Sequence, residues 1–133
     1  VVTPGCIDMV NFWGEETVPE KYKDRLFYHW NPNVTLMRTN VEENATLGKI
    51  FAEKLNMAIA PVKVLIPLKG FSEIDAPGQP FWWPEANQAF INELTKRLKP
   101  EIEIILMDNN VNDPEFSERC ATELLKLLGS NKN

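Results

Sequence analysis

The sequence of 133 residues lacks the glycine-rich loops that bind phosphate in standard nucleotide-binding folds. Neither G-x-x-x-x-G-K-[ST] nor G-x-G-x-x-G occurs, which excludes a standard nucleotide loop. A nucleophile elbow of the form G-x-S-x-G is also absent, because the segment 70–74 lacks the second glycine that allows the sharp turn. Any ligand site therefore has to lie in less regular segments.

Histidine and cysteine are scarce. His29 is the single histidine, and Cys6 and Cys120 lie near opposite ends of the chain. This spacing fits neither a zinc site nor a disulfide scaffold, and it indicates reduced thiols in a cytoplasmic protein. A triad of Ser72, His29 and Asp75 is formally available, but a lone histidine in an aromatic strand is more often structural.

Long apolar runs and clusters of basic residues are missing as well. The apolar runs are interrupted by charge or proline and are far too short to cross a bilayer, so no membrane partner is expected. The 14 basic residues are scattered among 19 acidic ones, for a net charge of −5 at pH 7, which argues against nucleic acid as a partner. The hydrophobic content of 44% instead fits one globular domain with a real core.

Strand and helix patterns alternate along the chain. Apolar or aromatic runs predict strands at 5–12, 25–31, 62–68 and 102–107, and helical periodicity predicts helices at 41–57, 84–98 and 114–128. Thr39 and Glu42 are expected to form a capping box, and Asp113 is expected to cap the last helix. This order predicts a Rossmann-like three-layer α/β/α sandwich with a mostly parallel sheet. The tail 130–133 is expected to fray.

Three connecting segments hold most of the unusual polar residues. The segments 31–39, 69–83 and 108–113 are predicted to be loops that leave the carboxyl ends of strands. In a parallel sheet these ends share one edge, and ligands bind there. We therefore expect the three segments to converge on one site.

The first of these segments has the chemistry of an anion site. Arg38 and the hydroxyls of Thr35 and Thr39 directly precede a predicted helix, whose free amides attract anions. The alternative is that Thr39 only caps the helix and Arg38 pairs with a nearby acid.

The second segment is the most distinctive stretch of the chain. Gly70 and Ser72 directly follow a buried strand, where they let a ligand approach the backbone, and Glu73 and Asp75 are candidates for orienting a polar substrate. The alternative is that Ser72 only caps local structure. The segment is also long enough to act as a lid.

Carboxylates and tryptophans add further candidates. A hypothetical magnesium set consists of Asp8, Glu73, Asp75 and Asp108. Tryptophans at predicted loops and strand ends can stack on a base, pack in the core or anchor a partner subunit, and these are Trp13, Trp30, Trp82 and Trp83.

Several motifs in matching order resemble a known family. They are Asp8-Met-Val-Asn-Phe12, Asn31-Pro-Asn-Val-Thr-Leu-Met-Arg-Thr39 with Glu42-Glu43-Asn44, Ile74-Asp-Ala-Pro-Gly-Gln-Pro-Phe81 and Asn112-Asp-Pro-Glu-Phe116. Together they are similar to an uncharacterised family whose members resemble the ATP-binding domain of the tomato mosaic virus resistance protein. The match covers nearly the whole chain.

This resemblance carries expectations about organisation and ligand. It implies that residues 1–133 are one α/β domain, a carboxyl-terminal fragment of a longer two-domain protein. It implies ATP, with magnesium, or a related nucleotide as ligand. The expected partners are the amino-terminal domain of the same protein, a second copy in a homo-oligomer and a small phosphorylated ligand. Carried over by motif, the ligand-facing residues are Thr35, Arg38, Thr39, Gly70, Ser72, Asp75, Asn112 and Asp113.

Three hypotheses about function remain open. In the first, the domain binds ATP, another nucleotide or a phosphorylated metabolite at the carboxyl edge of its sheet, with Arg38 as the anion clamp. In the second, it is a hydrolase or transferase that uses Asp75 or Glu73 as a base together with a metal. In the third, it is a structural half-domain that mediates interdomain or oligomer contacts.

Overall fold

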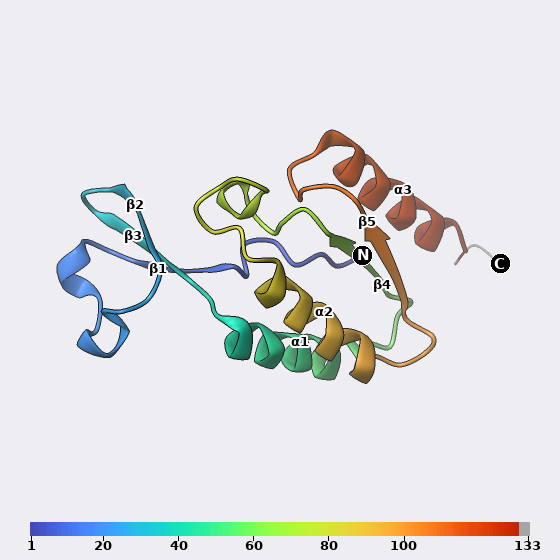
Figure 1. The fold of residues 1–133 in the computed structure, drawn as a ribbon. Helices are drawn as coiled ribbons and strands as arrows, with labels where there is room; N and C mark the ends of the chain where they lie inside the picture. Colours follow the sequence, from blue (N-terminus) through green and yellow to red (C-terminus); the bar gives the residue numbers. More distant parts are fainter. Residues whose placement is uncertain (131–133) are drawn as a thin grey trace.

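Strands and helices alternate in the computed structural model, which describes residues 1–130 (Figure 1). The strands are β1 (Met9–Phe12), β2 (Phe27–Asn31), β3 (Val34–Arg38), β4 (Lys63–Pro67) and β5 (Glu103–Met107), and the helices are α1 (Val41–Leu55), α2 (Pro84–Arg97) and α3 (Pro114–Ser130). Short 3-10 turns lie at Glu15–Thr17, Glu20–Tyr22 and Glu73–Asp75. The expected mixed α/β class is confirmed. The expectation of a frayed tail falls on residues 131–133, outside the described part.

β4 and β5 form a parallel pair along their whole length. Val2 lies at the other edge of β4, where its backbone makes hydrogen bonds of 2.9 Å with Lys63 and Leu65. The side chains of Val64, Leu65 and Ile66 are fully buried. The predicted strand at 62–68 is confirmed, and its almost continuous apolar run is typical of a strand covered on both faces.

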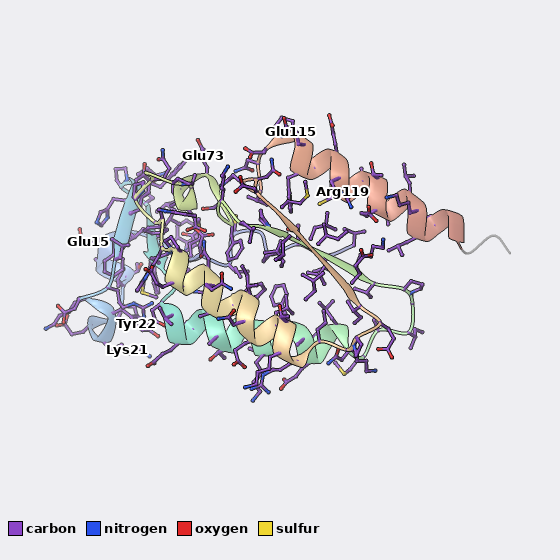
Figure 2. All side chains as sticks on the ribbon, turned by 45° about the vertical axis from the view of Figure 1, so that its right-hand side comes forward. Glu15, Lys21, Tyr22, Glu73, Glu115 and Arg119 are labelled. Atoms are coloured by element: carbon purple, nitrogen blue, oxygen red, sulfur yellow. The ribbon has the colours of Figure 1, made fainter. Side chains whose placement is uncertain are left out.

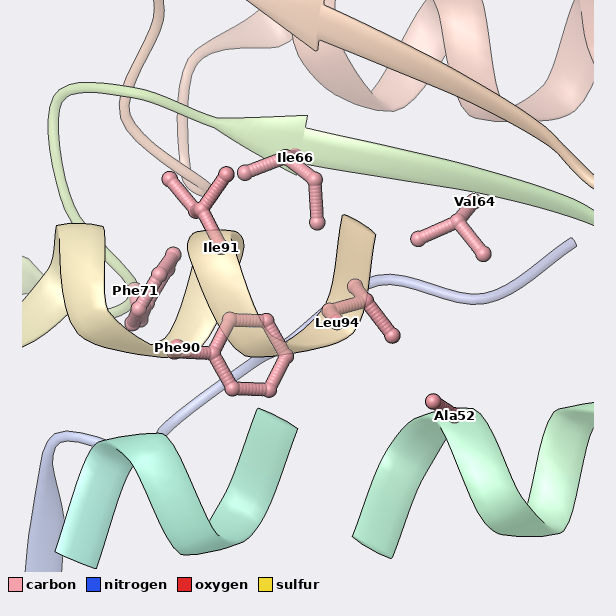
Figure 3. Packing of buried hydrophobic residues seen from close by; sticks show 7 residues of the cluster. All are labelled: Ala52, Val64, Ile66, Phe71, Phe90, Ile91 and Leu94. Carbon is pink, nitrogen blue, oxygen red and sulfur yellow. The ribbon is translucent and has the colours of Figure 1, made fainter. Parts of the chain in front are cut away.

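α1 and α2 pack closely together on one side of β4, and α3 lies on the opposite side of the parallel pair (Figures 1 and 2). Gly48 allows the two helices to approach, because a Cβ atom there would lie 2.4 Å from the carbonyl oxygen of Phe90. Figure 3 shows the buried core between α1, α2 and β4, which contains Ala52, Val64, Ile66, Phe71, Phe90, Ile91 and Leu94. Burial of these apolar side chains supplies the main driving force for folding. None of the helices within residues 1–130 is both long enough and apolar enough to cross a membrane.

β1, β2 and β3 form a second, antiparallel sheet with β3 in the centre. β3 occupies part of the segment 31–39, so the prediction of a loop there is wrong, and the described strands do not form one mostly parallel sheet. The side chain of Asn31 accepts a hydrogen bond of 2.8 Å from the N–H of Asn33, which turns the chain back into a hairpin. β3 is buried over 35–38 and therefore lacks the apolar–polar alternation by which a half-exposed strand is recognised.

The helix caps differ from the predicted ones by small shifts. In α1 the cap is Asn40, whose side chain accepts from the N–H of Glu43, while the Glu43 carboxylate accepts from the N–H of Asn40, each at 2.9 Å. The predicted box of Thr39 and Glu42 is thus one residue too early. The carboxylate of Asp113 accepts from the backbone N–H of residue 110 at 2.8 Å, so it closes the loop before α3.

Candidate functional site

Buried polar side chains gather where the antiparallel sheet meets α1, α2 and the segment after β4. We call this group the arginine cluster, and its members are Asp8, Arg38, Thr39, Asn44, Ser72, Asp75 and Asn87. Each is at most 5% exposed. Because unpaired polar groups are costly to bury, their hydrogen bonds decide what the cluster can do.

Arg38 lies at the centre of the cluster and is fully buried. Its Nη2 atom donates to Asp75 Oδ1 at 2.9 Å and to Asn87 Oδ1 at 2.7 Å, and its Nε atom donates to the carbonyl oxygen of Phe81 at 2.7 Å. Its Nη1 atom makes longer contacts of 3.4 Å with Thr39. The guanidinium of Arg38 therefore pairs with a nearby acid, Asp75. This is the alternative to anion binding given in the sequence analysis.

Asp75 is held as firmly as its partner. Its Oδ2 atom accepts from the N–H of Phe71 at 2.8 Å and from Asn87 Nδ2 at 2.9 Å, while Oδ1 accepts from Arg38. Burial raises the pKa of Asp75, and the Phe71 N–H and the Arg38 charge act against that rise. Burial likewise lowers the pKa of Arg38, and the charge of Asp75 opposes it. With both oxygens engaged inside the protein, Asp75 joins β3, α2 and the segment after β4, and this arrangement does not suit it to act as a base.

Ser72 connects the cluster to the surface. Its hydroxyl donates to Asp8 Oδ2 at 2.7 Å and accepts from the N–H of Asp75 at 3.2 Å, so it also caps the 3-10 turn that follows. Asp8 Oδ1 and Asn44 Oδ1 are buried without a hydrogen-bond partner among residues 1–130. Burial raises the pKa of Asp8, and the Ser72 hydroxyl acts against that rise.

A cavity of about 340 Å³ lies beside Ser72, at the carboxyl edge of the parallel strands. We call it the sheet-edge cavity. Its lining comes from the segments that follow Val2, β4 and β5 and from the antiparallel sheet, and it includes Gly5, Cys6, Trp30, Ser72, Glu73 and Asn112. The predicted meeting of the segments 69–83 and 108–113 is therefore found at this edge.

Hydrogen bonds hold the walls of the sheet-edge cavity together. Asn110 Nδ2 donates to the carbonyl oxygens of Lys69 and Ser72, at 3.0 and 2.9 Å. The N–H of Cys6 donates to the carbonyl oxygen of Phe71 at 2.7 Å. Three segments far apart in the sequence are thereby fixed around one hollow, which is the kind of preformed cavity in which ligands bind.

Gly70 has a structural role at this edge. Its φ of +114° lies in the region that favours glycine, and a Cβ atom there would lie 1.8 Å from the carbonyl oxygen of Asp75. The N–H of Val111 donates to the carbonyl oxygen of Gly70 at 3.1 Å. Gly70 thus lets the backbone after β4 pass close to the 3-10 turn.

The structure separates the predicted ligand-facing residues into several places. Ser72 and Asn112 line the sheet-edge cavity. Thr39 belongs to the arginine cluster with Arg38 and Asp75, and its hydroxyl donates to the carbonyl oxygen of Ile7 at 2.8 Å. Asp113 closes the loop before α3, and Thr35 lines a different cavity beside the antiparallel sheet.

Asparagines that the sequence analysis missed hold the site together. Asn87 lies on the apolar face of α2, three and four residues before the buried Phe90 and Ile91. Asn44 lies on the buried face of α1, four residues before Gly48. A polar residue inside an apolar helical stripe is the sequence signal that marks such a buried contact.

The carboxylates proposed as a magnesium set do not gather. Asp108 pairs with Lys69 at 2.9 Å on the surface, while Asp75 lies in the arginine cluster. Within residues 1–130, no group of three or more histidine, cysteine, aspartate and glutamate side chains could hold a metal ion. The predicted set is therefore wrong as a metal site.

These observations define a mixed α/β domain with a preformed cavity at the edge of its parallel strands. The model of the C-terminal domain of the uncharacterised protein family UPF0261 matches residues 1–128, and the chain belongs to this family. The family resemblance seen in the sequence motifs is confirmed.

The relatives are bacterial and plant proteins. A UPF0261 protein of Clostridium tetani is 46% identical over 129 residues, which cover 96% of this chain and 32% of the relative. A UPF0261 protein of Rhizobium meliloti is 45% identical over 116 residues, or 86% of this chain and 29% of the relative. The ToMV resistance protein Tm-1(GCR237) of Solanum lycopersicum is 36% identical over 135 residues, or 100% of this chain and 18% of the relative. The chain thus spans about a third or less of the length of these relatives.

Proposed function

We propose that this domain binds ATP, another nucleotide or a phosphorylated metabolite in the sheet-edge cavity. The observation that carries the proposal is the meeting, around one hollow, of the segments that follow β4, β5 and the parallel bridge at Val2. In open α/β sheets, ligands bind at this edge. The family resemblance supports the same class of ligand, because it implies ATP. The proposal includes a larger Rossmann-like sandwich around β4 and β5, which helices on both sides of the pair support (Figure 1).

The size and lining of the cavity favour a flat ring. Its volume of about 340 Å³ lies at the lower end of the range of roughly 300–1,000 Å³ for small-molecule sites. Trp30 lines it and is 59% exposed, so we propose its indole as the surface on which the ring stacks. Stacking of a base on an aromatic side chain is worth about 1–3 kcal/mol and tolerates any base.

The charge of the lining decides how a nucleotide would lie. Of the described residues that line the cavity, Glu73 is the charged one, and none is basic. We therefore expect the base and ribose to enter the cavity while the phosphates point toward solvent. Mg²⁺ would reduce repulsion between the phosphates and the Glu73 carboxylate.

Titration calorimetry of ATP, with and without magnesium, tests the proposal. Wild-type protein should bind ATP, more tightly when magnesium is present, and ATP should raise the melting temperature because it prefers the folded state. Trp30→Ala should weaken ATP affinity by about 5- to 150-fold, which corresponds to a stacking loss of ~1–3 kcal/mol.

Trp13→Ala is the matched control, because Trp13 is 74% exposed and does not line the sheet-edge cavity. Its ATP affinity should equal that of the wild type. If ATP binds and Trp30→Ala leaves its affinity unchanged, the ligand does not occupy this cavity. If no nucleotide or phosphorylated metabolite binds at all, the proposed function is wrong.

A second candidate function is contact with another part of the same protein. On α3, Leu124, Leu125 and Leu128 are 44, 69 and 56% exposed, and their spacing of three and four residues puts them on one side of the helix. Exposed apolar side chains that lie together mark interaction surfaces. Because the relatives are about three times as long as the part this chain matches, we propose the amino-terminal domain as the partner for this face.

A further inference from the structure

A second cavity, of about 230 Å³, lies beside the antiparallel sheet and is separate from the sheet-edge cavity. We call it the hairpin cavity. The 3-10 turns between β1 and β2 cover it, with Val18 and Pro19 on that side and Phe27 and Thr35 on the sheet. Figure 2 shows Glu15, which also lines it, at the end of the molecule away from α3. The proposed nucleotide site makes no use of these residues.

Thr35 is the buried polar group of this cavity. It lies in β3 between Phe12 of β1 and His29 of β2, and it is 1% exposed. Its hydroxyl has no hydrogen-bond partner among residues 1–130, although it lines the hollow. A hydroxyl that lines a cavity and has no hydrogen-bond partner within the described chain is available to a polar atom of a ligand. This hydroxyl therefore marks where a polar atom of a ligand would lie.

The charged residues that line the hairpin cavity decide whether it favours a cation or an anion. Glu20 pairs with Lys23 at 2.9 Å, so these two charges largely cancel. The carboxylate of Glu15 has no ion-pair or hydrogen-bond partner within the described chain. An anion would meet this unpaired negative charge, whereas a cation would gain a charge-assisted hydrogen bond. The walls formed by Val18 and Phe27 suit an apolar body.

We propose that the hairpin cavity binds a small organic amine with an apolar body. The ammonium group would donate to the Glu15 carboxylate and the Thr35 hydroxyl, and its hydrocarbon part would pack against Val18, Pro19 and Phe27. The volume of about 230 Å³ limits the ligand to a molecule smaller than a nucleotide. The proposal is independent of the proposed nucleotide function.

Benzylamine is the probe, followed by amide chemical shifts in NMR titrations of the protein. Benzylamine should give saturable shifts confined to residues 15–29 and 34–36, and benzyl alcohol, which lacks the charge, should bind at least about fivefold more weakly. Glu15→Gln should lower benzylamine affinity at least about fivefold, since it removes the charge from an exposed position. Thr35→Val, which keeps the shape of the side chain, should lower it about threefold or more.

Glu16→Gln is the matched control, because Glu16 neighbours Glu15 but does not line the cavity, and its benzylamine affinity should stay unchanged. Trp30→Ala should also leave it unchanged, which separates this site from the sheet-edge cavity. Equal affinity for benzyl alcohol, retention of affinity in Glu15→Gln, or shifts elsewhere in the protein would each overturn the proposal. Absence of saturable shifts up to about 20 mM benzylamine would do so as well.

Discussion

At the scale of single residues, Arg38 shows how burial changes what a substitution tests. Arg38→Ala would leave Asp75 Oδ1 and the carbonyl oxygen of Phe81 buried without the donor that Arg38 provides. Removing one partner of a buried ion pair costs about 3–5 kcal/mol, so we expect a loss of that size in the free energy of unfolding, measured by urea denaturation. A loss of ligand binding in this variant would therefore report unfolding and not a lost phosphate contact.

Arg97→Ala is the comparison for Arg38→Ala, because Arg97 pairs with Glu93 on the surface of α2 and its side chain is 41% exposed. Arg97→Ala should lower the free energy of unfolding by less than about 1 kcal/mol. If Arg38→Ala cost no more than Arg97→Ala, the arginine cluster would not be a structural centre.

Gly70 provides a second test at this scale. Alanine at this position would place a Cβ atom 1.8 Å from a backbone oxygen, in a conformation with positive φ. We expect Gly70→Ala to lower the free energy of unfolding by about 3 kcal/mol or more. A side chain at positive φ costs ~1–2 kcal/mol, and the backbone must also shift to remove the clash. Gly78→Ala is the control: its φ is +81° with nothing within 4 Å of the added Cβ, so only the smaller penalty should appear in urea denaturation.

At the scale of elements, a charged cluster fastens α3 to β4. Glu123 is 1% exposed, and its carboxylate accepts from Lys63 at 2.6 Å and from Arg119 and Lys126 at 2.8 Å. These cations lower the pKa of Glu123 to about 2. Because the unfolded value is higher, near 4.5, this contribution to stability is present above pH ~4.5 and disappears as the pH falls toward 2.

Glu123→Gln should therefore reduce the loss of stability that the protein shows as the pH falls from about 5 to 2. The expected result is a smaller change of melting temperature between about pH 5 and pH 2 than in the wild type, followed by circular dichroism. Glu118→Gln, on the exposed face of the same helix, should show the same change of melting temperature with pH as the wild type. If the melting temperature of Glu123→Gln fell between about pH 5 and pH 2 as much as that of the wild type, the charged cluster would not fasten α3.

The elements also show how far the sequence alone could lead. α1, α2 and β4 were predicted because their apolar periods and stop signals agree with their burial. β3 was missed, because its buried residues include Thr35 and Arg38 and its apolar pattern is broken by them. The cluster around Arg38 depends on contacts 37 and 49 residues away in sequence, with Asp75 and Asn87, which no local pattern reports.

At the scale of the whole molecule, Leu124, Leu125 and Leu128 of α3, which we call the leucine face, test the proposed contact with an amino-terminal domain. If the amino-terminal domain covers them, Leu125→Ser should cost about 2 kcal/mol of unfolding free energy in the full-length protein, since burying a leucine is worth ~1.5–3 kcal/mol. In the 133-residue chain, where Leu125 is 69% exposed, the same change should cost less than about 0.5 kcal/mol.

Ile59→Ser is the matched control for Leu125→Ser, because Ile59 is fully exposed in the turn after α1, away from the leucine face. It should be nearly neutral in both lengths of chain, as measured by chemical denaturation. An equally small effect of Leu125→Ser in both would reject the interdomain contact. A cost that appears only at high protein concentration would assign the leucine face to a second copy, because dimer stability depends on concentration.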